Sequence, residues 1–99
     1  MISVDNLDLV RWREMDSLNV LRLLAEHIKE DPSFHPRSSH LTTRWHAHAA
    51  GHDWEFLCTG PKFWDVRMDR GGGGAIDLVM HIHRLNFKAA AKLLKEKDV

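Results

Sequence analysis

Cysteine is nearly absent from this sequence, since Cys58 is the only one in 99 residues. A single cysteine excludes an internal disulfide and a zinc site made of several thiolates. The sequence also lacks an apolar run approaching the roughly eighteen residues of a transmembrane helix. Its first segment, MISVDNLDLVRWRE, carries acidic side chains and no long apolar stretch, unlike a signal peptide. We therefore expect a cytoplasmic protein without a membrane segment.

An excess of charge of one sign is missing as well. The 14 Lys and Arg residues balance 14 Asp and Glu residues, so the net charge is zero when the 8 histidines are neutral. Binding of nucleic acid requires clustered cations that contact phosphates. In this chain such a cluster of cations can only be local. The net charge of zero favours the alternative, which is a protein-interaction domain.

The first part of the chain predicts one helix. Residues 1–16 form an irregular or short helical lead-in, and 17–30 has the apolar spacing of an amphipathic helix. Asp31-Pro32 ends this helix, because the residue before a proline avoids the helical region. The Pro-, Ser- and His-rich segment 31–41 is predicted to be a loop.

The middle of the chain predicts a small sheet within 42–67. The three strand-like runs are 42–48, 53–59 and 62–67. The dipeptide Gly60-Pro61 is a tight turn that makes the second and third runs a hairpin. Alternation in the second run places three side chains on one face, those of Trp54, Phe56 and Cys58. The tryptophans Trp45, Trp54 and Trp64 are expected to form much of the core of this sheet.

A glycine-rich loop, 68–74, is predicted to follow the sheet, because glycines lose the most conformational freedom in regular structure. The remainder, 75–97, reads as a pair of helices, the second of them capped by Asn86. The predicted fold class is therefore α+β, with a small three-stranded antiparallel sheet, an N-terminal helix and two C-terminal helices in a single domain.

The most specific signal is the segment KFWDVRMDRGGGGAIDLVMHIHRLNFKAAAKLL, which runs from Lys62 to Leu94. In it a strand leads to a basic residue and glycines, then to a helix opening AIDLVM and a second helix opening NFKAA. This order resembles the C-terminal half of the N-terminal zinc-ribbon domain of bacterial DNA primases of the toprim type. It is still more similar to a ligand-free relative of that domain, found ahead of toprim primase-like domains in phage, plasmid and transposon proteins. The resemblance covers roughly residues 42–96.

The resemblance also shows departures from the zinc-bearing members. Where those have two cysteines before the glycines, this chain has Val66 and Asp69, and the earlier Cys/His pair would fall near Trp45-His46. A structural zinc needs four ligands. The resemblance therefore implies a domain of the primase zinc-ribbon-like fold that holds no zinc and is stabilised by its aromatic residues instead.

Histidines offer an alternative metal site. His46 and His48 would share one strand face, with His52 nearby and Cys58 as a further candidate ligand. On a helix, His81 and His83 are two residues apart and do not share a face well. We favour surface or satisfied core histidines, and hence no metal and no cofactor.

No catalytic set is evident in the sequence. Primases of the toprim type hold divalent metal with a glutamate and an Asp-x-Asp pair, and this chain has no Asp-x-Asp. Asp65 and Asp69 flank the arginines and are expected to pair with them, while Asp77 suits the first turn of its helix. We therefore expect a non-catalytic domain, which can be an accessory domain of a DNA primase.

The glycine run and its neighbours are the candidate binding site. Exposed amides ahead of a helix can cradle a phosphate, and an aromatic side chain on a sheet can stack on a base. Phe63 and Trp64 are adjacent, so one of them points outward. The alternatives are that the glycines only allow a sharp turn, and that Trp64 is a half-buried sheet residue. The predicted nucleic-acid-binding residues are Lys62, Trp64, Arg67, Arg70, Gly71, Gly72, Gly73 and Gly74.

From these features we expect a domain that binds single-stranded DNA in a primase-like replication system of a mobile genetic element, with a primase, polymerase or helicase subunit as a further partner. The alternative is a protein-interaction domain that docks its helix 17–30 or its C-terminal helices on a polymerase or helicase. A metal-dependent enzyme built on the histidines is a third, weaker hypothesis.

Overall fold

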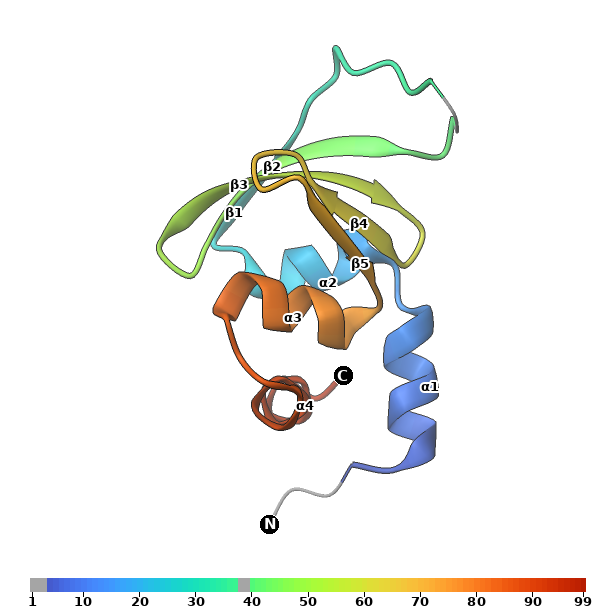
Figure 1. Cartoon of the computed structure of the whole chain (residues 1–99), viewed down its shortest axis with the longest axis vertical. Helices are drawn as coiled ribbons and strands as arrows, with labels where there is room; N and C mark the ends of the chain where they lie inside the picture. The colour runs from blue at the N-terminus through green and yellow to red at the C-terminus, as the bar shows by residue number, and fades with distance from the viewer. Residues whose placement is uncertain (1–3, 38–39) are drawn as a thin grey trace.

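The computed structural model describes residues 4–37 and 40–99 (Figure 1). Residues 1–3 of the predicted lead-in and 38–39 of the predicted loop lie outside the described residues. The elements are α1 (Asn6–Glu14), α2 (Ser17–Leu24), β1 (His27–Glu30), β2 (Thr43–Ala49), β3 (His52–Thr59), β4 (Lys62–Asp65), β5 (Arg70–Gly73), α3 (Ala75–His83) and α4 (Phe87–Glu96).

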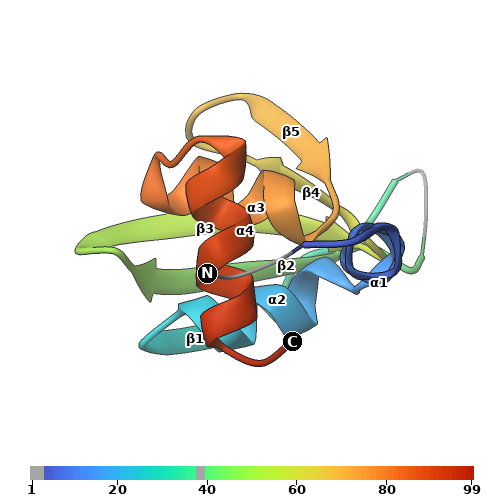
Figure 2. The same cartoon turned by 90° about the horizontal axis from the view of Figure 1, so that it is seen from below.

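The five strands form one antiparallel sheet in which each strand pairs with the next along the chain, in the order β1 to β5. Helices α2 and α3 lie against one face of the sheet, and α4 packs on the side of α3 away from it (Figures 1 and 2). Helix α1 lies beside them and contacts α3. Among the described residues, no helix covers the opposite face of the sheet (Figure 1).

The core lies between the sheet and helices α2 and α3. Strand alternation sends Trp54, Phe56 and Cys58 of β3 into it, as predicted, and every one of them is buried. Of the three tryptophans expected in the core, Trp45 and Trp54 are buried, whereas Trp64 is 42% exposed. The α+β class, the two C-terminal helices and the Gly60-Pro61 turn between β3 and β4 are confirmed.

The predicted helix over 17–30 is wrong in its second half. Helix α2 ends at Leu24, and His27–Glu30 is strand β1 at the edge of the sheet. Hydrogen bonds from Glu26 N to His48 O and from Asp31 N to Arg44 O, both 2.8 Å, hold it along β2. Pairing with a distant strand supplies these backbone partners, and helical spacing in the sequence does not reveal it.

The predicted lead-in also contains a full helix, α1. Its start is a capping box, in which the Asp5 carboxylate accepts from Asp8 N at 2.9 Å and the Asp8 carboxylate accepts from Asp5 N at 3.3 Å. The helix is anchored by Trp12, which is fully buried and donates from Nε1 to Val99 O at 3.0 Å. There are therefore two N-terminal helices, where one was expected.

The prediction of a loop over 68–74 is also wrong in part, because Arg70–Gly73 is strand β5, paired with β4. Together with β1 it makes a five-stranded sheet, not the expected three-stranded one. The strand fits because its glycines have no side chains. A Cβ at Gly71 would lie 2.7 Å from Cε3 of Trp64, and one at Gly72 would lie 3.0 Å from Cζ of Phe63. Ladder pairing and close approach offset the entropy that glycine loses here.

Candidate nucleic-acid interface

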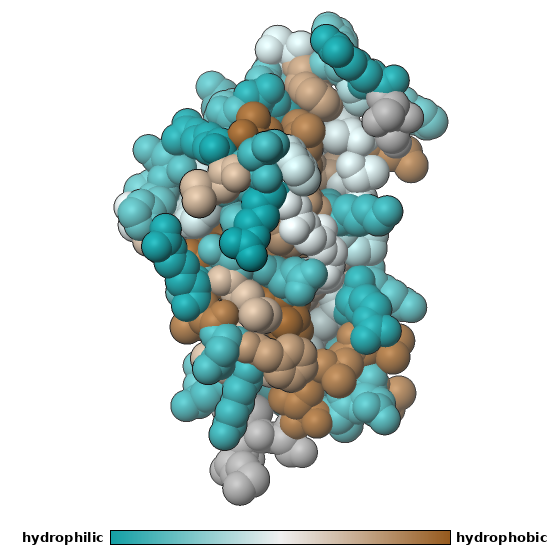
Figure 3. Space-filling view, in the orientation of Figure 1, coloured by the Kyte–Doolittle hydropathy of each residue, from teal (hydrophilic) through white to brown (hydrophobic). Residues whose placement is uncertain are grey.

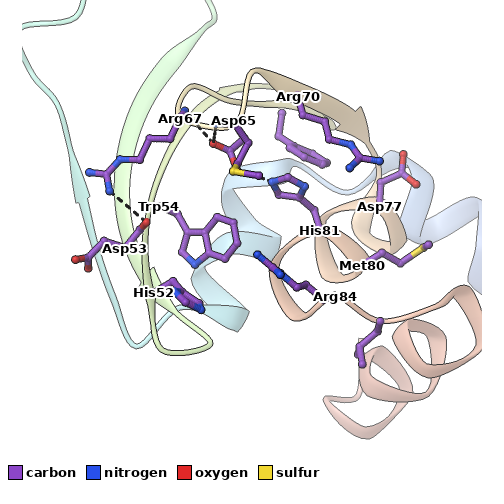
Figure 4. Close-up of a pocket in the computed structure, with 14 residues that line it drawn as sticks. His52, Asp53, Trp54, Asp65, Arg67, Arg70, Asp77, Met80, His81 and Arg84 are labelled. Atoms are coloured by element: carbon purple, nitrogen blue, oxygen red, sulfur yellow. Dashed lines mark hydrogen bonds and ion pairs between the residues drawn. The ribbon is translucent and has the colours of Figure 1, made fainter.

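Two surfaces meet at strand β5. One is the outer face, defined here as the uncovered side of the sheet with the side chains of Arg44, His46, Glu55, Leu57, Lys62 and Trp64. The other is an open pocket of about 810 Å³ on the helix side, between the sheet and the end of α3 (Figure 4). Gly71 contacts the Trp64 ring and also lines the pocket, so it borders both surfaces.

Trp64 is the aromatic side chain of the outer face. It is 42% exposed, whereas its neighbour Phe63 is 5% exposed and points into the core. The expectation that one of these two aromatics points outward is therefore confirmed. The six-membered part of the Trp64 ring lies against Gly71. Leu57 pairs with Trp64 across the strands, and Lys62 shares the face two residues away. The result is an apolar platform with a lysine beside it.

Glu55 is an acidic residue of the outer face and lies close to three basic side chains. Its carboxylate is in an ion pair with Arg44 and lies 3.4 Å from Nδ1 of His46 and 3.9 Å from Nη2 of Arg67. The two arginines are therefore partly neutralised. Lys62 makes no ion pair within the part of the chain that the structure describes. Neither Glu55 nor Arg44 was singled out in the sequence, because the four residues come together only through strand register and the β4–β5 turn.

The pocket has an aromatic floor. The His81 ring lies 5.5 Å from the ring of Trp54 and 5.6 Å from that of Phe63, measured between centroids. Its Nε2 is 2.6 Å from Oδ2 of Asp65, which is 1% exposed. The other oxygen of Asp65 accepts from the backbone N–H groups of Arg67 and Met68, both at 3.0 Å. The expected pairing of Asp65 with an arginine side chain is therefore wrong, because His81 and two amides satisfy the carboxylate.

The structure separates the two arginines that the sequence placed together. Figure 4 shows the Arg67 guanidinium pointing away from His81, and its Nη1 donates to Asp53 O at 3.4 Å. Arg70 pairs in register with Asp65, so its side chain lies on the pocket side of the sheet. Arg84, which the sequence analysis did not identify, lines the same pocket. It is the C-cap of α3 with a left-handed φ of 54°. No local motif predicts that it lines the same pocket as Arg70.

The glycine amides are only partly available to a phosphate. Gly73 N donates to the Asp77 carboxylate at 3.1 Å, and Gly74 N donates to Pro61 O at 3.0 Å. Gly74 has φ of 89°, and a Cβ there would lie 3.2 Å from Cα of Arg13. The alternative that these glycines serve turning and close packing is therefore well supported for Gly73 and Gly74. The Asp77 carboxylate already lies at the start of α3, where an anion would bind.

The histidines proposed as metal ligands are divided between the two faces. His46 and His48 share the outer side of β2, where His48 pairs with Asp53 at 2.9 Å. His52 points to the other side, edge-on to Trp54 at 6.2 Å. Cys58 is buried among core residues, and burial raises the pKa of its thiol. Within residues 4–37 and 40–99, no three His, Cys, Asp or Glu side chains are grouped so as to hold a metal ion.

Comparisons with protein-family models, with curated proteins and with solved structures find no match to this chain. The resemblance to the primase domain therefore stays a prediction that depends on the quoted residues. In the described ranges, none of the helices is both long and apolar enough for a membrane span.

Proposed function

We propose that this chain is a non-catalytic domain that binds single-stranded DNA in a primase-like replication system of a mobile element. The observation that carries the proposal is the exposure of Trp64 on the sheet face that no helix covers. A large aromatic ring exposed on a sheet is the feature with which single-strand binders stack on bases. Stacking requires an unpaired base, so the surface suits a single strand better than a duplex.

The charges support few phosphate contacts. Lys62 lies on the face of Trp64 without a carboxylate partner among the described residues, and Arg67 is held at its edge by Asp53 O and Glu55. Since the net charge of the chain is zero, attraction to DNA comes only from this local arrangement. Affinity is therefore expected to be modest.

The primase-like setting is supported by the sequence resemblance and by one contact. Val66 and Asp69 stand in the β4–β5 turn, where the zinc-bearing relatives have cysteines. In the same turn Asp65 binds the amides of Arg67 and Met68. We propose that these hydrogen bonds and the aromatic core stabilise the turn without zinc. A preparation with stoichiometric zinc that loses its structure in a chelator would contradict this part of the proposal.

The test is a titration of labelled single-stranded and duplex DNA at two salt concentrations. The parent protein should prefer the single strand, with a salt slope of about −1.4 to −2.1 for two or three contacts. Trp64→Ala should weaken binding by about 5-fold to 150-fold, the worth of one stacked base. The matched control is Phe87→Ala, because Phe87 is 51% exposed but lies on α4.

Equal binding by the parent and by Trp64→Ala would overturn the proposal. Failure to bind either DNA at low salt would overturn it as well. A preference for duplex DNA would also contradict it, because a base in a duplex cannot stack on a side chain without leaving its partner.

A second candidate function, a protein-interaction domain, is favoured by helix α1. Leu7 is 76% exposed and Val10 is 48% exposed, and their spacing of three residues puts them on one side of the helix. In Figure 3 hydrophobic residues gather on the lower part of the molecule, where α1 lies. If the parent protein binds no DNA, docking of this helix on a protein partner becomes the leading proposal. Leu7→Asp with Val10→Asp is then the variant that should abolish it.

A further inference from the structure

The pocket between β5 and α3 contains two cations without partners. Arg70 and Arg84 both line it, and neither makes a hydrogen bond or ion pair in the described part of the chain. Figure 4 shows them on opposite sides of the His81 ring. Two guanidinium groups at the rim of one hollow therefore have unused N–H donors, which the oxygens of an anion can accept.

Asp53, Asp65 and Asp77 also line the pocket, but among the described residues none of them forms an ion pair with Arg70 or Arg84, because each has other hydrogen-bond partners. Asp65 is buried and bound to His81 and two backbone amides. Asp77 accepts from Gly73 N, and Asp53 pairs with His48 on the outer side of the sheet. Arg67 borders the pocket as well, but its guanidinium points away from it.

The remaining walls suit a nucleotide. Edges of Trp54 and Phe63, the His81 ring and the side chains of Met68 and Met80 surround the hollow. They provide an apolar and aromatic lining beneath a cationic rim, the combination that holds a sugar and base while arginines hold a phosphate. The volume of about 810 Å³ leaves room for one nucleotide.

We propose that this pocket binds the phosphate of a nucleotide between Arg70 and Arg84, either at the end of a DNA strand or in a free nucleotide. The strand form of this proposal rests on the proposed function. Gly71 borders both the Trp64 platform and the pocket, and it has no side chain to separate them. A strand stacked on Trp64 can therefore pass over β5 and place its terminal phosphate at the two arginines.

The experiment compares oligonucleotides of one sequence that end in a 5′-phosphate, a 3′-phosphate or only hydroxyl groups. One phosphorylated end should bind about 10-fold or more tightly than the hydroxyl form, because charge-assisted hydrogen bonds are strong. Arg70→Gln and Arg84→Gln should each remove most of that preference. Arg13→Gln, an exposed arginine on α1 outside the pocket, is the matched control. Melting curves of all variants should stay close to that of the parent.

A second arm uses adenosine monophosphate and inorganic phosphate, followed by NMR shifts of the pocket residues. Shifts at Arg70, His81 and Arg84 with the nucleotide alone support the free-nucleotide source, even when no strand binds and the proposed function fails. Equal binding of all three oligonucleotides, with no nucleotide shifts, overturns the pocket proposal. Trp64-dependent strand binding would survive that result. The pocket proposal would also be overturned if the preference for a phosphorylated end persisted in both Arg70→Gln and Arg84→Gln.

Discussion

Asp65 and Glu55 lie on neighbouring strands, and their carboxylates differ in burial and in the kind of partner they bind. Asp65 points to the helix side of the sheet, is 1% exposed, and is satisfied by His81 and two backbone amides. Glu55 points to the outer face, and its side chain is 13% exposed. It is shared by Arg44, Arg67 and His46.

The difference shows how burial decides which cations stay free. A buried carboxylate needs hydrogen bonds from fixed donors, so Asp65 accepts from backbone amides and contacts a ring held in the core. Arg70, its neighbour across the strands, is therefore left without an ion pair to Asp65. Glu55 has no such fixed donors, and it pairs instead with the longer and more exposed side chains of Arg44 and Arg67 on its own face. The unpaired arginines consequently lie at the pocket, while the exposed tryptophan lies on the outer face.

The largest effect on stability should come from truncating the buried tryptophan, and it can be compared with truncation of the exposed one. Trp54 is 8% exposed, stacks on Phe56 at 5.8 Å and donates to Ala49 O at 2.8 Å. Trp54→Ala should cost about 3–5 kcal/mol and leave unfolded or molten protein, because a domain of this size has little stability to spare. Trp64→Ala should cost less than about 1 kcal/mol. Chemical denaturation measures both, and similar losses would show that the two faces are equally buried.

Next in size is removal of the buried charge. Asp65→Asn replaces an acceptor with an N–H group facing His81, and should cost about 2–4 kcal/mol because the buried bonds to charged groups are lost. Glu55→Gln on the outer face should cost less than Asp65→Asn, because its partners Arg44 and Arg67 are 30% and 56% exposed and water can replace part of these ion pairs. The comparison fails if the two variants have the same free energy of unfolding in urea.

A pair of glycine variants tests the contact between the two surfaces. Gly71→Ala brings a Cβ within 2.7 Å of the Trp64 ring and 2.9 Å of Phe63 O, and should cost about 1–3 kcal/mol by overpacking. In Gly73→Ala the nearest atom is 3.9 Å away, on the Lys62 side chain, so stability should be kept or rise by about 0.5 kcal/mol. Thermal melts give the order of the two variants, and the indole N–H signal of Trp64 in NMR spectra should shift more in Gly71→Ala than in Gly73→Ala.

Glu55→Gln should also strengthen DNA binding, by about 3-fold at low salt, because it releases Arg67 and leaves Arg44 with Asp31, 3.8 Å away, as its remaining acidic partner. The salt dependence should become steeper by about 0.7 for each new contact. Asp69→Asn is the control, since this exposed carboxylate forms no ion pair among the described residues. Unchanged affinity in Glu55→Gln would show that the outer-face cations do not touch the strand.

The smallest effect concerns pH. Asp53 raises the pKa of His48 above 6.5, mainly through their hydrogen bond, and His48 lowers the pKa of Asp53 below 3.8. The stabilisation that follows from the raised His48 pKa is fully present below pH 6.5 and is lost as pH rises through the raised pKa. The stabilisation that follows from the lowered Asp53 pKa is lost as pH falls through that lowered pKa. The melting temperature of Asp53→Asn should therefore be lower than that of the parent at about pH 5–6. At about pH 8 the two melting temperatures should be equal. NMR should place its His48 pKa nearer 6.5.

Local sequence was enough to predict several parts of this molecule. Alternation in 53–59 placed Trp54, Phe56 and Cys58 in the core, and the adjacency of Phe63 and Trp64 required one of them to point outward. Asn86 accepts from Ala89 N at 2.8 Å and caps α4 as expected. These features depend on neighbours within a few residues, so the order of side chains determines them.

Only the tertiary structure decided the rest. His27–Glu30 and Arg70–Gly73 become strands because other strands offer them backbone partners, against helical spacing in one case and glycine entropy in the other. The same pairing brings His81 to Asp65 and puts Arg70 and Arg84 at one pocket while turning Arg67 away. Such contacts join residues far apart in the chain, and their free energy comes from burial and register, which no local pattern encodes.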